Sequence, residues 1–391
     1  MLEIALSADP VQARHGSDAL FRVLVEGIAD RFEPRLSGVY AGVISRAIAR
    51  AVPGHDPGKL VARYHRIRRV RPFHGSIGSD EFVYVLSRVT LGADVAVTSV
   101  LLDAAKRRFP EARVCLVGSE KSRDLFAADP RVEWLPADYG RHGTLRERLA
   151  AGEALAARLA ASASLVIDPD SRLTQLGVLP VCPEKNYLLF ESRAYGGDGE
   201  GSLTTLAQRW AAEVFGVDDA APYVALAEAP GGIAGPFILV NLGVGGNPAK
   251  RIPGDFERDL LRGLLRKGLK LVVDLGAGGE EEERVRRAIA GCTVPEGALT
   301  SWRGSFAALA ALIRKSSLYV GYDSGGQHAA AVCGTPLVTV FAGSVSPRMF
   351  ARWRPTGPGP KEVIQADRSD PRTVLEQTLA AAGRFIRDPG A

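Results

Sequence analysis

The stretch Leu318–Phe341 most constrains what this chain can fold into, because it places two apolar runs on either side of a glycine turn and an alanine-rich segment. Leu318–Tyr322 and Leu337–Phe341 each have the length and composition of a buried strand. The alanine-rich Gln327–Cys333 predicts a short helix between them, which a glycine and a proline then end. The pattern therefore predicts a β–α–β unit with a close turn after its first strand.

The turn before this helix consists of Asp323, Ser324, Gly325 and Gly326, and His328 follows in the first helical turn. Aspartate and serine are common N-cap residues, and glycine lets the backbone approach a ligand closely. Free N–H groups and the positive end of the helix dipole would form an anion site suited to a diphosphate. The alternative is an ordinary β–α turn without a ligand, since such turns are common.

Length and composition set the outer limits. The chain has 391 residues, of which 46% are hydrophobic, so we expect at least two domains with sizeable cores. It has neither a run of about 18 apolar residues nor a basic start followed by an apolar core, so we expect no transmembrane helix, no signal peptide and a cytoplasmic location. The cysteines are scattered and the histidines form no ligand pattern, so we expect free thiols, no metal site and no cofactor.

The net charge of +5 is unevenly distributed. Residues 1–75 contain 12 Lys/Arg and 7 Asp/Glu, whereas the rest of the chain contains 37 of each. We expect residues 1–75 to form a helical, basic N-terminal extension. The arginine-rich part at 63–71 predicts either a solvated helix face or a peripheral contact with anionic lipid at the inner membrane face. No nucleic-acid recognition motif accompanies it, so we expect no nucleic-acid partner.

Strands and helices alternate through the remainder of the chain. We expect one β–α series in residues 76–220, a second in 236–370 after a linker rich in proline and glycine, and a C-terminal helix in 371–391. Repeated alternation predicts an α/β fold of two Rossmann-like, doubly wound domains, which we expect to face a cleft. Ligands bind such sheets at the carboxyl ends of their strands.

These motifs resemble those of the bacterial heptosyltransferase family, glycosyltransferase family 9, whose members use ADP-heptose to build lipopolysaccharide. The resemblance covers roughly residues 82–350 and is strongest between Ala308 and Pro347. The stretch Lys250–Pro253 resembles the family's Lys-Arg-Trp-Pro, with Ile252 in place of the tryptophan. Residues 87–94 resemble the family's Arg-x-Gly-Asp loop, with Ala93 inserted before the acid.

The resemblance implies a GT-B fold, with the first domain binding the acceptor and the second binding the nucleotide sugar. It also implies an inverting, metal-independent transfer of a sugar, heptose above all, from an ADP-sugar donor to a lipopolysaccharide-like or other glycan acceptor. Asp94 and Lys250 are the implied catalytic residues. The implied substrate-binding residues are Gly92, Asn247, Arg251, Glu280, Asp323, Ser324, Gly325, Gly326 and His328.

Each catalytic role has a physical reason. A diphosphate leaving group needs a positive field, which Lys250 and the helix start after Ser324 could supply without a metal. The attacking hydroxyl needs a base, for which Asp94 is the first candidate and Asp168, at the end of another strand, the second. Alternatively, Asp94 only caps the helix expected to begin at Val95.

Two other functions remain open from the sequence. One is a nucleotide-sugar-binding protein that has lost transfer and acts as a scaffold or partner subunit, which the inserted Ala93 and the replaced tryptophan at Ile252 favour. The other is a sugar-nucleotide epimerase of similar fold.

Overall fold

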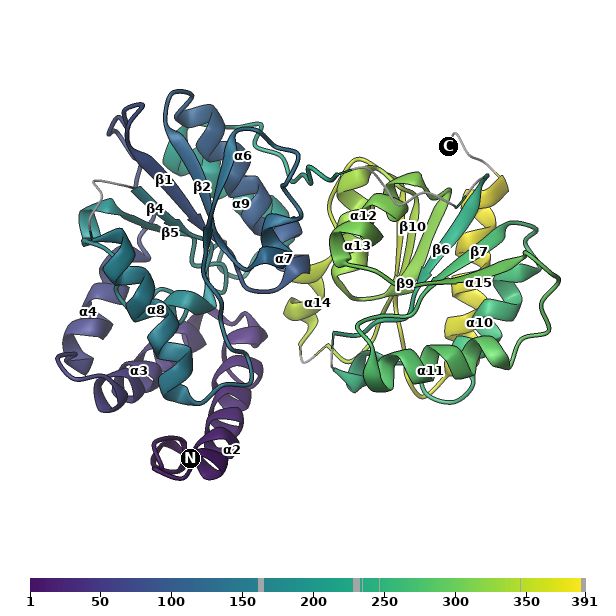
Figure 1. The fold of residues 1–391 in the computed structure, drawn as a ribbon, viewed down its shortest axis with the longest axis horizontal. Coiled ribbons are helices and arrows are strands. Elements are labelled where there is room, and N and C mark those ends of the chain that lie inside the picture. Colours follow the sequence, from purple (N-terminus) through teal and green to yellow (C-terminus); the bar gives the residue numbers. More distant parts are fainter. Residues whose placement is uncertain (161–164, 228–232, 234, 246, 345, 388–391) are drawn as a thin grey trace. The chain divides into compact units, whose positions relative to one another are not determined.

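The computed structural model describes the chain in two compact units. Unit 1 comprises Met1–Pro222 with Val345–Trp353, and unit 2 comprises Tyr223–Ser344 with Arg354–Ala391. Each unit contains one parallel sheet (Figure 1), so the predicted α/β class is confirmed. The described residues are all those of the chain except 161–164, 228–232, 234, 246, 345 and 388–391.

The sheet of unit 1 has five parallel strands in the order β3-β2-β1-β4-β5. The chain starts in the middle of this sheet and moves first to one edge and then to the other, as a doubly wound sheet does. The strands are β1 (Phe82–Leu86), β2 (Arg113–Gly118), β3 (Val132–Pro136), β4 (Leu165–Asp168) and β5 (Tyr187–Leu189).

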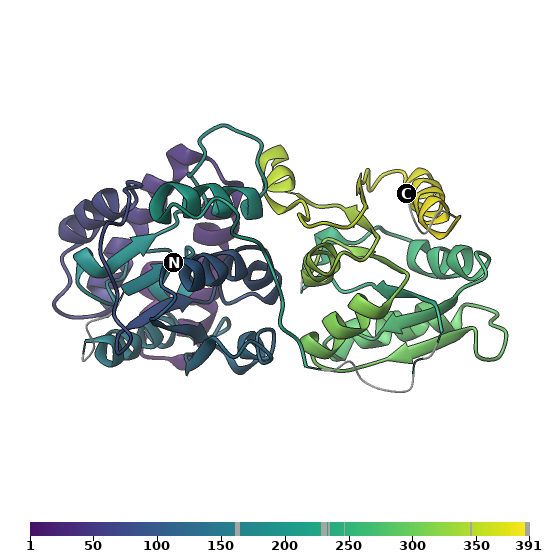
Figure 2. The same ribbon diagram turned by 90° about the horizontal axis from the view of Figure 1, so that it is seen from above.

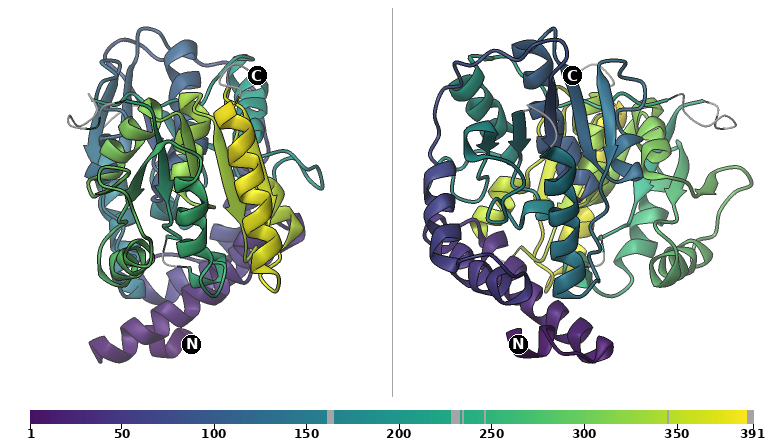
Figure 3. Two further views of the ribbon diagram at one scale, coloured as in Figure 1. Left: turned by 90° about the vertical axis from the view of Figure 1, so that its right-hand side faces the viewer. Right: turned by 60° about the vertical axis from the view of Figure 1, so that its left-hand side comes forward.

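The N-terminal helices share the hydrophobic core on one face of this sheet. They are α1 (Leu2–Ala5), α2 (Pro10–Phe21), α3 (Pro34–Ala51) and α4 (Pro57–Ile67), and they are joined there by α8 (Leu145–Leu159). Each of α2, α3 and α4 begins with proline, whose fixed φ suits the first helical position. Figure 3 shows α1 and α2, in purple, projecting beyond the sheet. The basic extension is therefore part of the core of unit 1 and not a separate appendage.

A second set of helices, α6 (Ser99–Arg108) and α9 (Leu203–Phe215), packs together beside the sheet of unit 1, and α7 (Glu120–Arg123) is one short turn after β2. The helix after β1 begins with α5 (Leu91–Ala93) and continues through a π-helical turn at Asp94–Thr98 into α6. The prediction that this helix begins at Val95 is therefore wrong. Thr90 is extended and acts as the N-cap, so the first turn forms four residues earlier.

The sheet of unit 2 has six parallel strands in the order β11-β10-β9-β6-β7-β8. Helices lie on both faces of it, as Figure 2 shows. The strands are β6 (Phe237–Asn241), β7 (Lys270–Asp274), β8 (Leu299–Trp302), β9 (Leu318–Tyr322), β10 (Leu337–Phe341) and β11 (Lys361–Gln365). The helices are α10 (Phe256–Leu265), α11 (Gly279–Ala290), α12 (Phe306–Lys315), α13 (Gly325–Cys333) and α15 (Pro371–Arg387).

Helix α14 (Pro347–Trp353) belongs to unit 1, although the chain on both sides of it belongs to unit 2. Arg352 is 1% exposed and donates to the carbonyl oxygens of Gly199 and Gly201 at 2.7 and 2.6 Å. The Trp353 ring meets Phe32 edge-on at 6.2 Å. These contacts tie a late segment of the chain to a glycine-rich loop of the first unit.

Candidate functional site

The start of helix α13 lies directly after β9, as the sequence predicts, but the helix begins at Gly325, two residues earlier than expected. Ser324 is the N-cap residue in an extended conformation, and its side chain makes no capping hydrogen bond. A Cβ atom on Gly326 would lie 2.4 Å from the hydroxyl oxygen of Tyr319, so only glycine fits against this strand. The helix start is thus held close to the sheet and left without a side-chain cap.

Lys250 lies beside this helix start. Its Nζ is 2.7 Å from the Asp323 carboxylate and 3.2 Å from the Asp323 carbonyl oxygen. Gln327 donates to the other Asp323 carboxylate oxygen at 2.6 Å and in turn accepts from Thr339 at 3.0 Å. Burial raises the pKa of Asp323, while Lys250 and Gln327 oppose that shift. Asp323 therefore fixes a lysine ammonium group at the N-terminal end of α13 and does not itself point to an anion.

His328 is buried in the first turns of α13, where it is 5% exposed. Burial, and to a smaller degree the neighbouring Lys250, lowers its pKa to about 3. The imidazole is therefore neutral at physiological pH and adds no positive charge to the helix start.

Two further polar residues at strand ends join this turn, and sequence reasoning missed them. Asn241 ends β6 and Asp274 ends β7, and the Asn241 amide donates to Asp274 at 2.7 Å. The Ser324 hydroxyl donates to the side-chain amide oxygen Oδ1 of Asn241 at 3.4 Å. Burial raises the pKa of Asp274 to about 6. Their positions after apolar strands were the available signal, because the carboxyl ends of parallel strands share one edge.

Glu281 connects the two glycine-containing loops at the same edge. Its carboxylate accepts the N–H groups of Val244 and Ala277, each at 3.2 Å. The predicted Glu280, one residue before it, is exposed in the first turn of α11. The family resemblance points to Glu280, whereas the neighbouring Glu281 makes these contacts.

The other predicted residues of the Lys250 loop have structural contacts. Asn247 is exposed and accepts the Ala249 N–H at 3.0 Å, which caps the short helical turn Pro248–Lys250. Arg251 lies 3.5 Å from Glu257. Ile252, which stands where the family has tryptophan, is buried at 1% exposure.

In unit 1, Asp94 is wholly buried and lies inside the helix, not in the loop before it. Its carboxylate accepts four hydrogen bonds, each 2.8 Å long, from the Arg88 N–H and the hydroxyl groups of Ser87, Thr98 and Ser122. Burial raises the pKa of Asp94 and these donors oppose the shift. The prediction that Asp94 caps a helix starting at Val95 is wrong, because it instead holds the β1 loop and α7 onto the helix.

Gly92, the other predicted residue of this loop, lies within the same first helical turn and is partly exposed. Asp168, the second candidate base, is also wholly buried. It accepts from the Ser171 N–H at 2.6 Å, from Thr174 at 2.5 Å and from the Tyr187 hydroxyl. Burial raises its pKa to about 6. Both carboxylates thus occur at the carboxyl edge of this sheet, and both are already hydrogen-bonded within unit 1.

A buried charged cluster at the same edge was not predicted. Arg88 donates to Ser192 at 2.7 Å, and Ser192 donates to Asp170 at 2.7 Å. Arg193 forms an ion pair with Asp170. Asp170 has a left-handed φ of 73°, which is unusual for a residue with a side chain.

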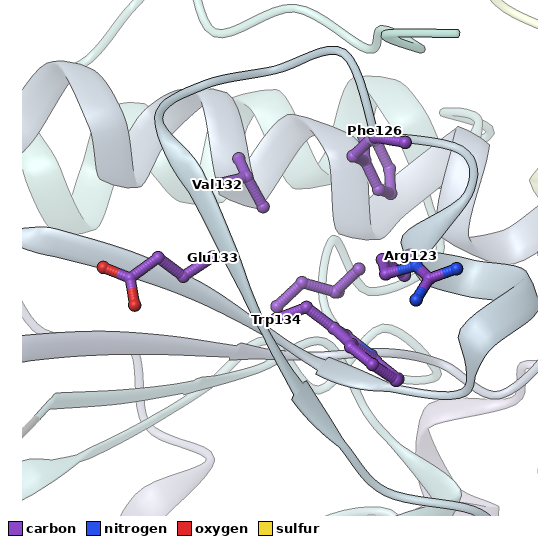
Figure 4. Close-up of a pocket in the computed structure, with 7 residues that line it drawn as sticks. Arg123, Phe126, Val132, Glu133 and Trp134 are labelled. Atoms are coloured by element: carbon purple, nitrogen blue, oxygen red, sulfur yellow. The ribbon is translucent and has the colours of Figure 1, made fainter. Parts of the chain in front are cut away.

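A cavity of about 340 Å³ lies between α7 and the edge strand β3 (Figure 4). Its charged side chains are already paired: Arg123 with Glu120 and Asp124, and Glu133 with Arg113. It therefore presents an apolar wall without an uncompensated charge. In the part of the chain that the structure describes, no group of three or more His, Cys, Asp or Glu residues could hold a metal ion.

Comparison with known proteins gives the following matches. Residues 204–374 match the model of glycosyltransferase family 9 (heptosyltransferase). The structure resembles a family 9 glycosyl transferase from Veillonella parvula DSM 2008 (TM-score 0.57, 16% identity, covering 79% of this chain and 98% of that one). It also resembles E. coli ADP-heptose lps heptosyltransferase II (TM-score 0.54, 16% identity, covering 79% of this chain and 99% of that one). A third similar structure is E. coli heptosyltransferase WaaC with ADP (TM-score 0.52, 16% identity, covering 79% of this chain and 100% of that one). No curated protein sequence matches the chain.

The two parallel-sheet units and this likeness show that the chain has the GT-B fold. The family 9 match covers residues 204–374, so this part of the chain is a glycosyltransferase domain similar to the heptosyltransferases.

Proposed function

We propose that this enzyme transfers heptose from ADP-heptose to a lipopolysaccharide-like or other glycan acceptor, with inversion at the sugar carbon and without a metal ion. The observation that carries the proposal is the Lys250 ammonium group held by Asp323 at the uncapped start of α13. A helix N-terminus and a lysine together provide the positive field that a departing diphosphate needs.

Each turn residue then has a defined task at the donor. The N–H groups of Gly325 and Gly326 and the Ser324 hydroxyl would contact phosphate oxygens, and Lys250 would stabilise the charge that grows as the glycosidic bond breaks. Neutral His328 would add at most a hydrogen bond. Glu280, exposed at the start of α11, would bind the nucleoside part.

The choice of ADP-heptose follows the relatives: one similar structure is an ADP-heptose heptosyltransferase and another contains ADP. We propose a cytoplasmic location, where such a nucleotide sugar would be available. Asp94 is the proposed general base, because burial raises its pKa and inversion requires a single displacement by a deprotonated hydroxyl. Such a role would require the side chain to leave at least one of its hydroxyl donors.

The experiment that tests the proposal is ADP release from ADP-heptose, with and without acceptor glycans. Heptose-dependent ADP release that increases with the acceptor supports it. A panel with UDP- and GDP-sugars controls for the nucleotide, and equal turnover with those donors would contradict the ADP assignment.

A second function, that of a nucleotide-sugar-binding scaffold without transfer, is favoured by the four donors that occupy the Asp94 carboxylate. It predicts that ADP-heptose binds but is not consumed in the presence of any acceptor. Calorimetric binding measured beside ADP release separates the two functions.

A further inference from the structure

The excess positive charge of the chain lies in a short part of the N-terminal extension. Residues 1–50 contain six Lys/Arg and six Asp/Glu, whereas residues 51–75 contain six Lys/Arg and one acid, Asp56. The whole +5 of the protein is therefore concentrated on α4 and the segment that follows it.

Three of the five arginines at 63–71 are bound to other groups of unit 1 and do not form a free basic face. Arg63 is buried and donates to the Gly177 carbonyl oxygen at 2.9 Å. Arg66 pairs with Glu184 at 2.9 Å, and Arg68 pairs with Glu191 at 3.0 Å. Of the arginines in this stretch, only Arg69 and Arg71 therefore remain candidates for contact with lipid.

Four other cations lie on α3, on α4 or directly after α4, and these two helices are neighbours on the outside of unit 1 (Figures 1 and 3). Arg46 on α3, Lys59 on α4, and Arg69 and Arg71 after α4 are all exposed. Among the described residues, none of the four forms an ion pair or a side-chain hydrogen bond. Their charges are thus available to an external anion.

Exposed large hydrophobic side chains occur in the same segment. In the part of the chain that the structure describes, all of them fall within residues 1–70: Met1, Ile4, Val11, Val23, Val39 and Val70. Val39 lies seven residues before Arg46, on the same side of α3, and Val70 lies between Arg69 and Arg71. Val39 is 50% exposed and Val70 is 38% exposed, so each presents apolar surface near these unpaired cations.

We propose that the outer surface of the N-terminal helices, formed by Arg46, Lys59, Arg69 and Arg71 with Val39 and Val70, docks the enzyme onto an anionic lipid bilayer. The lysine and arginines would attract anionic head groups, and the valines, with the apolar tip of α1 and α2, would enter the head-group region. No helix in the described part of the chain has the length and apolar character of a membrane span. The proposed contact is with the surface of the bilayer. The binding surface is argued independently of the proposed function. Only its purpose, which is to bring the enzyme to a lipid-linked acceptor, rests on that function.

Vesicle sedimentation of the full-length protein tests this surface. The probes are phosphatidylcholine vesicles with and without phosphatidylglycerol, at low and high salt. The variant combines Arg46→Gln, Lys59→Gln, Arg69→Gln and Arg71→Gln. Each lost cation should weaken partitioning about fivefold, so the combined loss should be roughly several hundredfold, and high salt should weaken binding of the wild type.

Two matched variants control for total charge and for folding. Lys121→Gln, Arg131→Gln, Arg287→Gln and Lys315→Gln together remove four exposed charges elsewhere and should leave vesicle binding unchanged. Arg46→Lys, Arg69→Lys and Arg71→Lys keep the charge and should retain binding.

Three outcomes would overturn the proposal: no binding of the wild type to phosphatidylglycerol vesicles, equal binding to pure phosphatidylcholine, or an equal loss in the control with four charges removed elsewhere. Because this assay needs no turnover, its failure is distinguishable from failure of the glycosyltransfer reaction.

Discussion

Replacing Lys250 with alanine should separate its contact with Asp323 from its proposed role at the donor phosphate. The Lys250 ammonium group is 2.7 Å from the Asp323 carboxylate and also lies at the start of α13. Loss of a charge-assisted contact to a phosphate costs about 1.5–3 kcal/mol, so ADP affinity should fall roughly 10- to 150-fold. Isothermal calorimetry with ADP measures this directly.

The same substitution should destabilise unit 2, because it leaves Asp323 buried without its cation. Removing one partner of a buried ion pair costs about 3–5 kcal/mol, and about half of that is expected here because the Lys250 side chain is 19% exposed. The pKa of Asp323 is already raised by burial and should rise further without Lys250. The folded state then binds the proton more tightly than the unfolded state, so the stability deficit should grow as pH rises from acidic to neutral.

The double variant Lys250→Ala/Asp323→Asn distinguishes binding from folding. Asparagine keeps an oxygen for Gln327 but carries no charge, so urea unfolding should show most of the stability recovered at neutral pH. ADP affinity should stay low, because the ammonium group is still missing. Unchanged ADP affinity in Lys250→Ala, or full recovery of ADP binding in the double variant, would refute the assignment of Lys250 to the phosphate site.

Three other changes test the remaining assignments. Asp94→Asn should lower turnover by about 10²–10⁴-fold. ADP binding and folding should be retained, since the amide oxygen can still accept the Arg88 N–H. Near-normal turnover, with Asp168→Asn measured beside it, would leave Asp94 only the role of organising the loop. Turnover should persist in the presence of a chelator, and a loss that magnesium restores would contradict metal independence. Gly326→Ala places a Cβ 2.4 Å from the Tyr319 hydroxyl and should lower the free energy of unfolding by about 1–3 kcal/mol, measured in urea. Tyr319→Phe should recover part of this loss. A wild-type unfolding midpoint for Gly326→Ala would disprove the close packing.

The strongly periodic elements of the fold were predictable from the sequence. The strands at β1, β6, β9 and β10 are apolar runs of the right length, and Ser305, a residue type that commonly caps helices, caps α12. The short edge strands β8 and β11 were missed, because their half-exposed residues carry no continuous apolar signal. The packing of the N-terminal helices into the core of unit 1 depends on contacts between distant segments, which periodicity does not report.

The residues of the candidate site that belong to a sequence motif were predictable. Properties that depend on the packing of distant residues were not. Lys250 and the Asp323 turn meet, as the resemblance implies. The ion pair itself, the neutral state of His328 and the occupied carboxylate of Asp94 follow from burial and from neighbours far away in the chain. Asn241 could have been proposed from its place at a strand end.

The path of the chain through α14 bears on how such an enzyme could recombine. The polypeptide passes from one unit to the other at Pro222, returns at Val345 and leaves again after Trp353. A crossover in the linker between two related genes would therefore not exchange whole domains. The hybrid would receive its α14 from one parent and the glycine loop that Arg352 binds from the other. The two units of this enzyme are thus expected to be inherited together, unless both ends of this short helix are exchanged as well.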